Sequence, residues 1–317
     1  MISIIIVSYN NFHLLDNCLE SVFNKIDSNY NFEVIVVDNN SQCGDVEEIT
    51  NKYKNIVLIK NSENLGFSKA NNQAALIAKG EYLLLLNNDT ILIENPFAYL
   101  LKLKTIEESN FLIGIKMKNK DLSFQQSAFK FPSAWESFSS NFFLYLIFRK
   151  IDLFQKYYVN IQSEQNLKHV DYVIGAFMFL KKEFYLKLNG FDEKFFFFHE
   201  DIELCRRVWD VGGLVIYCPQ TSIIHFGGAT TGNLPWFKYR NMHISRIQFF
   251  HKHLKFPEKH LALLFELIGI IIRIPIFFLL GSISLNFNLI KRAYIYFKLL
   301  FVYKKNEFKN EVKVVKI

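Results

Sequence analysis

Polar and acidic residues that could bind a nucleotide follow three apolar runs near the start of the chain. They are Ser8-Tyr9-Asn10, Asp38-Asn39-Asn40 and Asn87-Asn88-Asp89. An aspartate at the end of a buried strand can accept a hydrogen bond from a base N–H or a ribose hydroxyl, so Asp38 is a candidate for nucleoside binding. The alternative for Asp38 is a helix N-cap or an Asx turn.

Asp89 is a candidate ligand for Mg²⁺ or Mn²⁺. Hard cations take oxygen ligands and keep substrate phosphates in their shell, so a carboxylate here suits a metal shared with a diphosphate. The alternative is an ordinary strand-end turn.

A predicted phosphate-binding segment begins at Asn64. Gly66 permits close approach of the backbone, and the helix that follows carries Lys69 and Asn72. A helix N-terminus near a lysine favours phosphate. The alternative is a helix start with no ligand.

Two later clusters could complete the chemistry. Glu200 and Asp201 follow the aromatic run Phe195–Phe198, which would desolvate a neighbouring carboxylate, raise its pKa and suit it to act as a general base. Acidic residues also stabilise a helix N-terminus without any catalytic role. His225, before two glycines, is either a third metal or phosphate ligand or a structural histidine.

The elements that must position these residues alternate in type. Strands are expected at 2–9, 32–37, 56–59 and 82–86, and helices at 14–23, 46–53 and 68–78. Continuous apolar runs separated by helices predict a parallel sheet covered on both faces. The polar clusters then lie at the carboxyl edge of the sheet, where open α/β sheets bind ligands.

Patterns typical of strands and helices are weak in the middle of the chain, roughly Pro96–Val170, and are clear again after it. A strand is expected at 172–180, a helix at 201–211 and a further strand at 214–217. The aromatic stretch Phe142–Phe148 fits the core or an acceptor-facing helix, and the core interpretation is favoured.

The C-terminal part of the chain changes in composition. Leu261–Leu280 is almost wholly apolar, apart from Glu266, Arg273 and Pro275, and its flanks on both sides are basic. Basic residues mark cytoplasmic sides, which favours a segment lying in the inner leaflet over a span or a buried helix. We therefore expect a catalytic domain at 1–255 and a helical, membrane-associated segment at 256–317.

Composition bounds the class of protein. Half of the 317 residues are hydrophobic, so the chain is not disordered. The net charge of +7 suits anionic partners, but no basic run with interleaved aromatics indicates nucleic acid. The four cysteines form no CxxC pair and are expected to be reduced thiols. The apolar N-terminus lacks a basic n-region, so it indicates a strand in a cytosolic protein and no signal peptide.

Taken together, these motifs resemble the family-2 glycosyltransferases of GT-A fold, most of all a rhamnosyltransferase-like branch, over about residues 1–230. The matching stretches are Ser3–Asn10, Val34–Ser41, Glu63–Asn72, Leu83–Thr90, Gly175–Leu180, Gly190–Asp192 and His199–Arg206.

The resemblance implies roles for residues by position. Asp38 would bind a uracil or thymine ring and its ribose, and Asp89 would ligate the metal as the last residue of a DXD-like triplet. The triplet departs from many relatives in starting with Asn87. Asp201 would be the general base, with Glu200 as the rival, and His225 would help to hold the metal or diphosphate. The expected donor-binding residues are Ser8, Tyr9, Asn10, Asp38, Asn64, Gly66, Lys69, Asn72 and Asn88.

The activity implied is inverting transfer of a sugar, with rhamnose suggested, from a dTDP- or UDP-linked donor. The acceptor would be a glycan or polyprenyl-linked glycan used for cell-surface polysaccharide, at the cytoplasmic face of the membrane. Two alternatives remain open: a sugar nucleotidyltransferase, although the loop after the first strand lacks Gly, Lys and Arg, and a non-catalytic membrane-anchored binding protein. A processive synthase is disfavoured, because there is one long apolar segment and no Gln-x-x-Arg-Trp motif.

Overall fold

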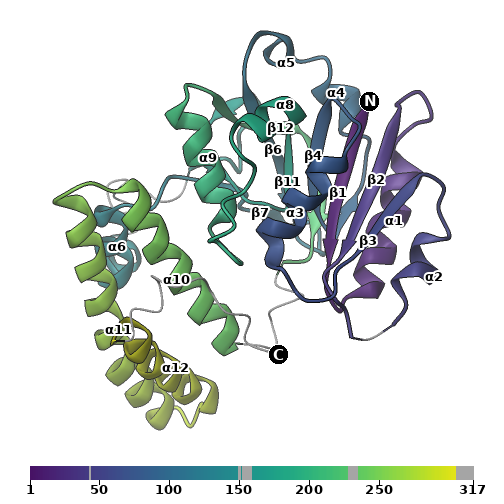
Figure 1. The fold of residues 1–317 in the computed structure, drawn as a ribbon. Helices are drawn as coiled ribbons and strands as arrows, with labels where there is room; N and C mark the ends of the chain where they lie inside the picture. Colours follow the sequence, from purple (N-terminus) through teal and green to yellow (C-terminus); the bar gives the residue numbers. More distant parts are fainter. Residues whose placement is uncertain (43, 149–150, 152–158, 228–234, 305–317) are drawn as a thin grey trace. The chain divides into compact units, whose positions relative to one another are not determined.

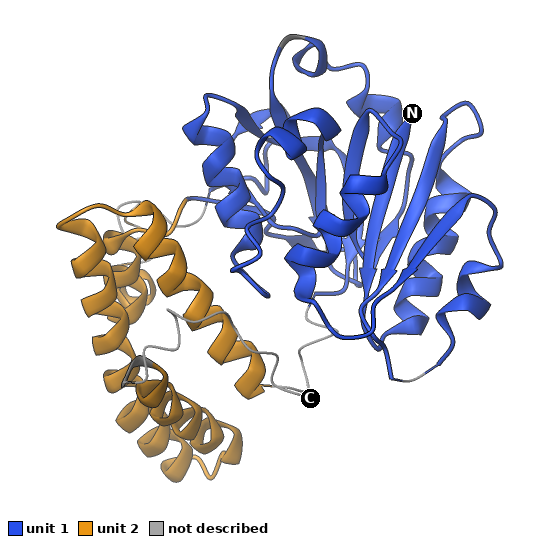
Figure 2. Cartoon of the chain, viewed as in Figure 1, with its two compact units in different colours: residues 1–130, 159–230 blue, residues 131–158, 231–317 orange. Residues whose placement is uncertain are grey.

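The computed structural model describes residues 1–42, 44–148, 151, 159–227 and 235–304. The chain divides into two compact units, shown in different colours in Figure 2. Unit 1 contains residues 1–130 and 159–230, and unit 2 contains residues 131–158 and 231–317. Unit 2 therefore begins earlier than the expected boundary at 255 and takes in a segment from the middle of the chain.

Unit 1 is built on a large, mostly parallel sheet with the strand order β3-β2-β1-β4-β11-β6-β12-β5 (Figure 1). Strands β3, β2, β1 and β4 run parallel, β11 is antiparallel to both β4 and β6, and β12 is parallel to β6. The strands of this sheet are β1 (Ile2–Ser8), β2 (Phe32–Asp38), β3 (Ile56–Lys60), β4 (Tyr82–Asn87), β5 (Thr90–Leu92), β6 (Phe111–Lys118), β7 (Phe124–Gln125), β9 (Lys168–His169), β11 (Phe177–Lys181) and β12 (Leu214–His225). Strands β8 (Ala128–Phe129) and β10 (Tyr172–Val173) form a separate pair.

Helices cover both faces of this sheet, as the continuous apolar strands predict. Ile4 and Ile6 belong to a core cluster that includes Leu15 and Leu19 of α1, whereas Ile5, on the opposite face, is also fully buried. Figure 1 shows α3 on one side of the sheet and α1 and α2 on the other. The helices of unit 1 are α1 (Phe12–Lys25), α2 (Val46–Thr50), α3 (Gly66–Ile77), α4 (Phe97–Leu100), α5 (Lys104–Glu108), α8 (Lys182–Lys187) and α9 (Glu200–Asp210).

Two strand predictions differ from the structure. The expected strand at 172–180 is broken into β10 and β11, because residues 174–176 leave the ladder. The expected strand at 214–217 continues to His225, with an irregularity between Cys218 and Ser222 that restarts the pairing with β6. Both differences bear on the site, since each places a functional residue at the end of a strand.

Unit 2 is helical among its described residues. Its helices are α6 (Ala134–Asn141), α7 (Leu144–Ile147), α10 (Pro235–His253), α11 (Glu258–Ile283) and α12 (Phe287–Lys304). Helix α11 is the one described helix long and apolar enough to cross a membrane, which is weak support for a span. In α7, Leu146 and Ile147 are exposed, so the core interpretation of 142–148 is wrong for these two residues.

Candidate active site

The sheet topology brings several strand ends to one edge, here named the carboxyl edge. Strands β1, β2 and β4 end there. Strand β12 runs in the same direction, so it ends at that edge too, and the antiparallel β11 begins there. The predicted polar clusters therefore share an edge with residues from much later in the chain.

Ser8, Asp38 and Asn88 meet at the carboxyl edge. Ser8 is paired with Asp38 in the ladder of β1 and β2, and the Ser8 hydroxyl lies 3.3 Å from Asn88 Nδ2. All three residues are buried. This part of the edge therefore presents polar groups that the protein itself excludes from bulk water.

The carboxylate of Asp38 is held within a turn. Ser41 Oγ donates to Asp38 Oδ1 at 2.5 Å, and Ser41 N donates to Asp38 Oδ2 at 3.3 Å. The Ser41 hydroxyl also accepts from Asn10 N at 2.9 Å, and Asn10 Oδ1 accepts from Gln42 N at 2.7 Å. The Asp38 carboxylate thus accepts both hydrogen bonds from Ser41, three residues on, and the same turn joins the loops that follow β1 and β2. Sequence reasoning did not single out Ser41.

Asp89 and His225 form a close pair. Pairing of β5 with β12 sets His225 opposite Thr90, and Phe226 N donates to Asp89 O at 3.0 Å. Asp89 Oδ1 lies 3.4 Å from His225 Nε2, and both side chains are largely buried. The other ring nitrogen, Nδ1, lies 2.8 Å from Gln125 Oε1.

These contacts suit a hard cation. An Nδ1–H donated to Gln125 would leave the Nε2 lone pair of His225 facing Asp89, which is the arrangement that orients metal-ligating histidines. Asn87 Oδ1 is buried and has no hydrogen-bond partner within the described residues. Among the described residues, no group of three or more His, Cys, Asp or Glu side chains could hold a metal ion. A metal held by Asp89 and His225 would therefore need phosphate or water oxygens to complete its shell.

Asp201 lies at the first turn of α9, where two backbone groups bind its carboxylate. Gly175 N donates to Oδ2 and Ile202 N to Oδ1, each at 2.8 Å. Burial raises the pKa of Asp201, and the two N–H groups offset part of this effect. The preceding residues Phe198 and His199 both have positive φ, at 69° and 63°. Such backbone is costly for non-glycine residues and recurs at functional sites.

Glu200 has a different environment. Its side chain is buried, and Oε2 has no hydrogen-bond partner within the described residues. Burial, and then the neighbouring charge of Asp201, raise the pKa of Glu200 well above its ordinary value. Burial therefore favours the protonated form of Glu200.

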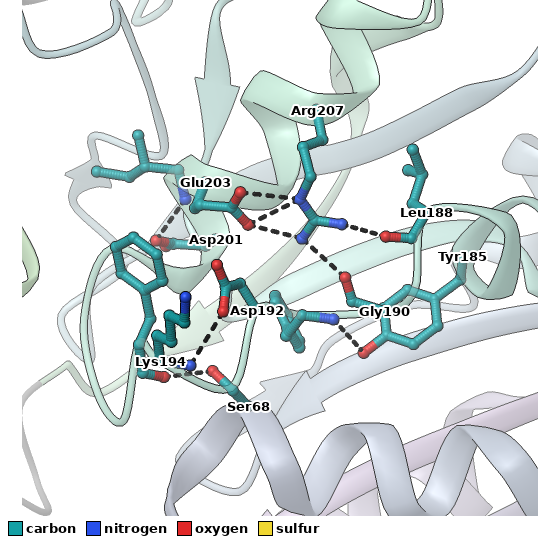
Figure 3. A network of polar contacts seen from close by, with 12 residues as sticks. Ser68, Tyr185, Leu188, Gly190, Asp192, Lys194, Asp201, Glu203 and Arg207 are labelled. Atoms are coloured by element: carbon teal, nitrogen blue, oxygen red, sulfur yellow. Dashed lines mark hydrogen bonds and ion pairs between the residues drawn. The ribbon is translucent and has the colours of Figure 1, made fainter. Parts of the chain in front are cut away.

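An ion pair fixes the helix that carries Asp201 (Figure 3). Arg207 binds the fully buried Glu203 one turn away, at 2.6 Å, and donates to the carbonyl of Gly190 at 2.7 Å. Arg207 also donates to the carbonyl of Leu188. Helix α9 is thereby tied to the loop that follows α8.

Asp201 reaches the carboxyl edge through the start of β11. Asn87 N donates to Ala176 O at 3.1 Å, and the neighbouring Gly175 donates to the Asp201 carboxylate. The strand ends that carry Asp38 and Asp89 and the helix turn that carries Asp201 thus belong to one connected network.

The predicted phosphate-binding start of α3 has a different use in the structure. The N–H groups of Leu65, Gly66 and Phe67 donate to Asn39 Oδ1, Asn64 Oδ1 and Phe196 O, respectively. Gly66 does permit a close approach, as expected, but the approaching group is Phe196. A Cβ at position 66 would lie 2.7 Å from the Phe196 carbonyl oxygen. The φ of Gly66 is +82°, in the left-handed region. These three N–H groups are therefore engaged within the protein.

Asn72 also serves the protein interior. Its Oδ1 accepts from Tyr185 OH at 2.6 Å and from Phe191 N at 2.8 Å, and its Nδ2 donates to Phe191 O at 2.9 Å. Asn72 therefore anchors the loop after α8. Lys69, on the same helix, is exposed. Asn39, Gln125 and Gly175 were missed as individual site residues, since only their contacts reveal them.

The fold and the site define a glycosyltransferase, and the chain belongs to glycosyl transferase family 2, whose pattern matches residues 3–184. Residues 156–227 also match a family described as the N-terminal domain of galactosyltransferase. The expected GT-A fold and membership of the family are confirmed. The sugar nucleotidyltransferase alternative is not supported by this assignment.

Individual relatives are more distant. The chain is 28% identical over 236 residues to rhamnosyltransferase WbbL of Escherichia coli, covering 71% of this chain and 83% of that protein. It is 28% identical to N-acetylglucosaminyl-diphospho-decaprenol L-rhamnosyltransferase of Mycobacterium tuberculosis over 72 residues, 23% of this chain and 24% of the relative.

Solved structures show the same fold. A crystal structure of GalNAc-T7 with UDP, GalNAc and Mn²⁺ has a TM-score of 0.57 at 16% identity, covering 79% of this chain and 49% of that one. S. aureus TarS has a TM-score of 0.52 at 18% identity, covering 80% of this chain and 40% of that one. The chain thus spans half or less of each of these two proteins.

Proposed function

We propose that this enzyme transfers a sugar, with inversion, from a dTDP- or UDP-linked donor to a glycan or polyprenyl-linked glycan in cell-surface polysaccharide synthesis. One observation carries the proposal. The Asp89–His225 pair and the Asp201 carboxylate are joined at one sheet edge by the contacts of Asn87 with Ala176 and of Gly175 with Asp201. These contacts support a metal–diphosphate position and a general base within one site.

The residues divide the work in the following way. Asp38 and Ser8 hold the nucleoside at the ends of β2 and β1. Asp89 and His225 hold a divalent metal, Mg²⁺ or Mn²⁺, which when bound offsets charge on the leaving diphosphate. Asp201 takes the proton of the acceptor hydroxyl, whose oxygen attacks the anomeric carbon from the face opposite the diphosphate. A single displacement inverts the configuration and needs no covalent intermediate.

The names of the relatives support a substrate class. Two of them are rhamnosyltransferases, one of which acts on an N-acetylglucosaminyl-diphospho-decaprenol. We accordingly propose rhamnose as the sugar and a polyprenyl-diphosphate-linked glycan as the acceptor. We further propose a catalytic domain at 1–255 and a membrane-associated helical segment at 256–317, at the cytoplasmic face of the membrane. The apolar helix α11 supports that location.

A panel of nucleotide-sugars tests this function. Release of nucleoside diphosphate is measured for each donor with added Mg²⁺ or Mn²⁺ and again after chelation. We expect one donor to be turned over, with a large loss on chelation, and an Asp89→Ala variant to lose metal-dependent donor binding. A donor that binds without any release of nucleoside diphosphate would favour the non-catalytic alternative. Turnover indifferent to chelation would remove the metal from the proposal.

A further inference from the structure

The turn between α11 and α12 exposes a cluster of large apolar side chains. Ile283, Leu285 and Phe287 are 81%, 81% and 75% exposed, and the preceding Phe278–Leu280 are exposed as well. Helices α11 and α12 form an antiparallel pair, since Gly281 lies against Ile290 and Phe277 stacks on Tyr296 with 5.6 Å between ring centroids. We name residues 274–290 the hairpin tip. Exposed apolar clusters of this kind mark surfaces that contact a partner or a membrane.

The charge pattern around the hairpin tip identifies the partner. Residues 274–290 contain no charged side chain, and no acidic residue occurs between Glu266 and Glu307. Basic residues follow the tip directly, where Lys291 and Arg292 are exposed. The tip is uncharged and mostly apolar, with Ser282, Ser284, Asn286 and Asn288 as its polar residues. Such a tip, bounded by cations, complements a bilayer with anionic head groups, because the acyl region takes the apolar side chains and the head groups take the cations.

The two charged residues within the apolar part of α11 are already satisfied inside unit 2. Glu266 Oε1 accepts from Arg246 Nε at 2.8 Å and from Asn141 Nδ2 at 3.2 Å. Arg273 donates to Asn141 Oδ1 at 2.5 Å and to Ser140 O at 3.0 Å. These contacts bind the helix to α6 and α10 of the same unit. A full crossing by α11 would have to break them and place both charges in hydrocarbon, at about 2.5–3.5 kcal/mol for a central charge.

The dimensions fit one leaflet. Eleven residues separate Arg273 from the turn at Ser284, which is about 16 Å of helix at 1.5 Å per residue. On α12, the five residues Phe287–Lys291 give about 8 Å. The hydrocarbon core of a bilayer is about 30 Å thick, so one leaflet offers about 15 Å. The shorter arm, which ends at Lys291, sets the depth of insertion at about 8 Å, so the tip enters part of one leaflet and then reverses.

We infer that the hairpin tip, residues 274–290, inserts into one leaflet of an anionic bilayer, with Lys291 and Arg292 on its head groups, and that α11 does not span the membrane. This inference rests on the proposed location at a membrane surface and defines the element responsible. A monotopic insertion leaves both chain ends of the hairpin on the same side.

Vesicle flotation of the full chain tests the insertion. The probes are phosphatidylcholine vesicles with and without about one third phosphatidylglycerol. The variant I283D/L285D/F287D should lose at least tenfold in partitioning. The control L76D/L122D/V211D changes three exposed apolar residues of unit 1 and should bind like the wild type. The variant K291Q/R292Q should lose about fivefold per cation on anionic vesicles at low salt, since each contributes about 1 kcal/mol near such a surface.

Depth and oligomeric state complete the test. A Leu285→Trp variant should be quenched by labels in the acyl chains of the leaflet that it enters, and a position in the far head groups would show a span and overturn the inference. Equal partitioning of the tip and control variants would also overturn it. So would a solution dimer that the tip variant dissociates while its vesicle binding is unchanged. Donor hydrolysis is measured in parallel without vesicles, where the tip variant should retain activity. If the wild type hydrolysed no donor, the proposed function would be refuted, and the result on insertion would still stand.

Discussion

Replacing Asp201 by asparagine separates the chemistry of this residue from its structural contacts. The carboxylate accepts two backbone N–H groups, from Gly175 and from Ile202, each at 2.8 Å. Asparagine keeps one acceptor oxygen and turns an N–H₂ group toward the other donor, which costs about 1–3 kcal/mol for an unsatisfied buried group. Part of this cost is offset, because burial disfavours the charged carboxylate and the raised pKa of Asp201 reports that penalty. The variant should therefore fold.

The catalytic loss should be much larger. Removal of a general base typically costs 10²- to 10⁴-fold in rate, which corresponds to about 3–5 kcal/mol of barrier. Donor affinity should stay within about threefold, because the proposed donor contacts come from other residues. Single-turnover transfer at saturating donor measures the first quantity and calorimetric titration of the donor measures the second. The reasoning is refuted if Asp201→Asn transfers sugar at nearly the wild-type rate.

The neighbouring acid provides the control and a pH signature. Burial, and then the charge of Asp201, raise the pKa of Glu200 well above its ordinary value, which favours the protonated form. Glutamine imitates that protonated form. We expect Glu200→Gln to keep most activity. The acidic limb of its pH profile of kcat/KM should coincide with that of the wild type, and the pKa of this limb should lie above the usual range for aspartate. A larger loss in Glu200→Gln than in Asp201→Asn would exchange the two roles.

Three further predictions follow from single contacts. Gln125→Ala should raise the metal concentration for half-maximal activity by about 10- to 100-fold, because it removes the partner that orients His225; unchanged metal affinity would contradict this. The raised pKa of Glu200 means that its protonated form stabilises the fold below about pH 4.5, and that this stability is lost as pH rises through the folded-state pKa. The Tm of Glu200→Gln minus the Tm of the wild type should therefore increase as pH rises, and a decrease in this difference would contradict the prediction. Gly66→Ala should lower Tm by several degrees, since a Cβ there meets Phe196 O at 2.7 Å in a backbone with φ of +82°; an unchanged melting curve would refute the clash.

The order of elements in the first ninety residues was predictable from sequence because it depends on local information. The apolar runs around Ile5, Ile35 and Leu85 are continuous, and a strand buried on both faces requires that pattern. The ends of such strands share an edge in any parallel sheet, so the meeting of Ser8, Asp38 and Asn88 followed from the pattern.

Contacts between distant segments were not predictable in this way. The pairing of β12 with β5 sets His225 beside Asp89, but the sequence of β12 gives no sign of its partner strand or of its continuation past Cys218. The start of α3 is a second example of a contact that the sequence does not specify. A glycine at a helix N-terminus is compatible with phosphate or with a protein carbonyl, and here the group is Phe196 O. The local residue types show that another group can approach the backbone closely, but they do not determine which group it is.

The break between β10 and β11 explains how the Asp201 carboxylate, from late in the chain, is tied to the end of β4, from early in the chain. Within a continuous strand the Gly175 N–H would pair with a neighbouring strand. Because residues 174–176 leave the ladder, this N–H is available for Asp201, and Ala176 O still accepts from Asn87. The carboxylate is thus positioned by main-chain groups of the β10–β11 connection and of α9 itself. The position of this carboxylate therefore depends on the path of the backbone in the β10–β11 connection and in α9.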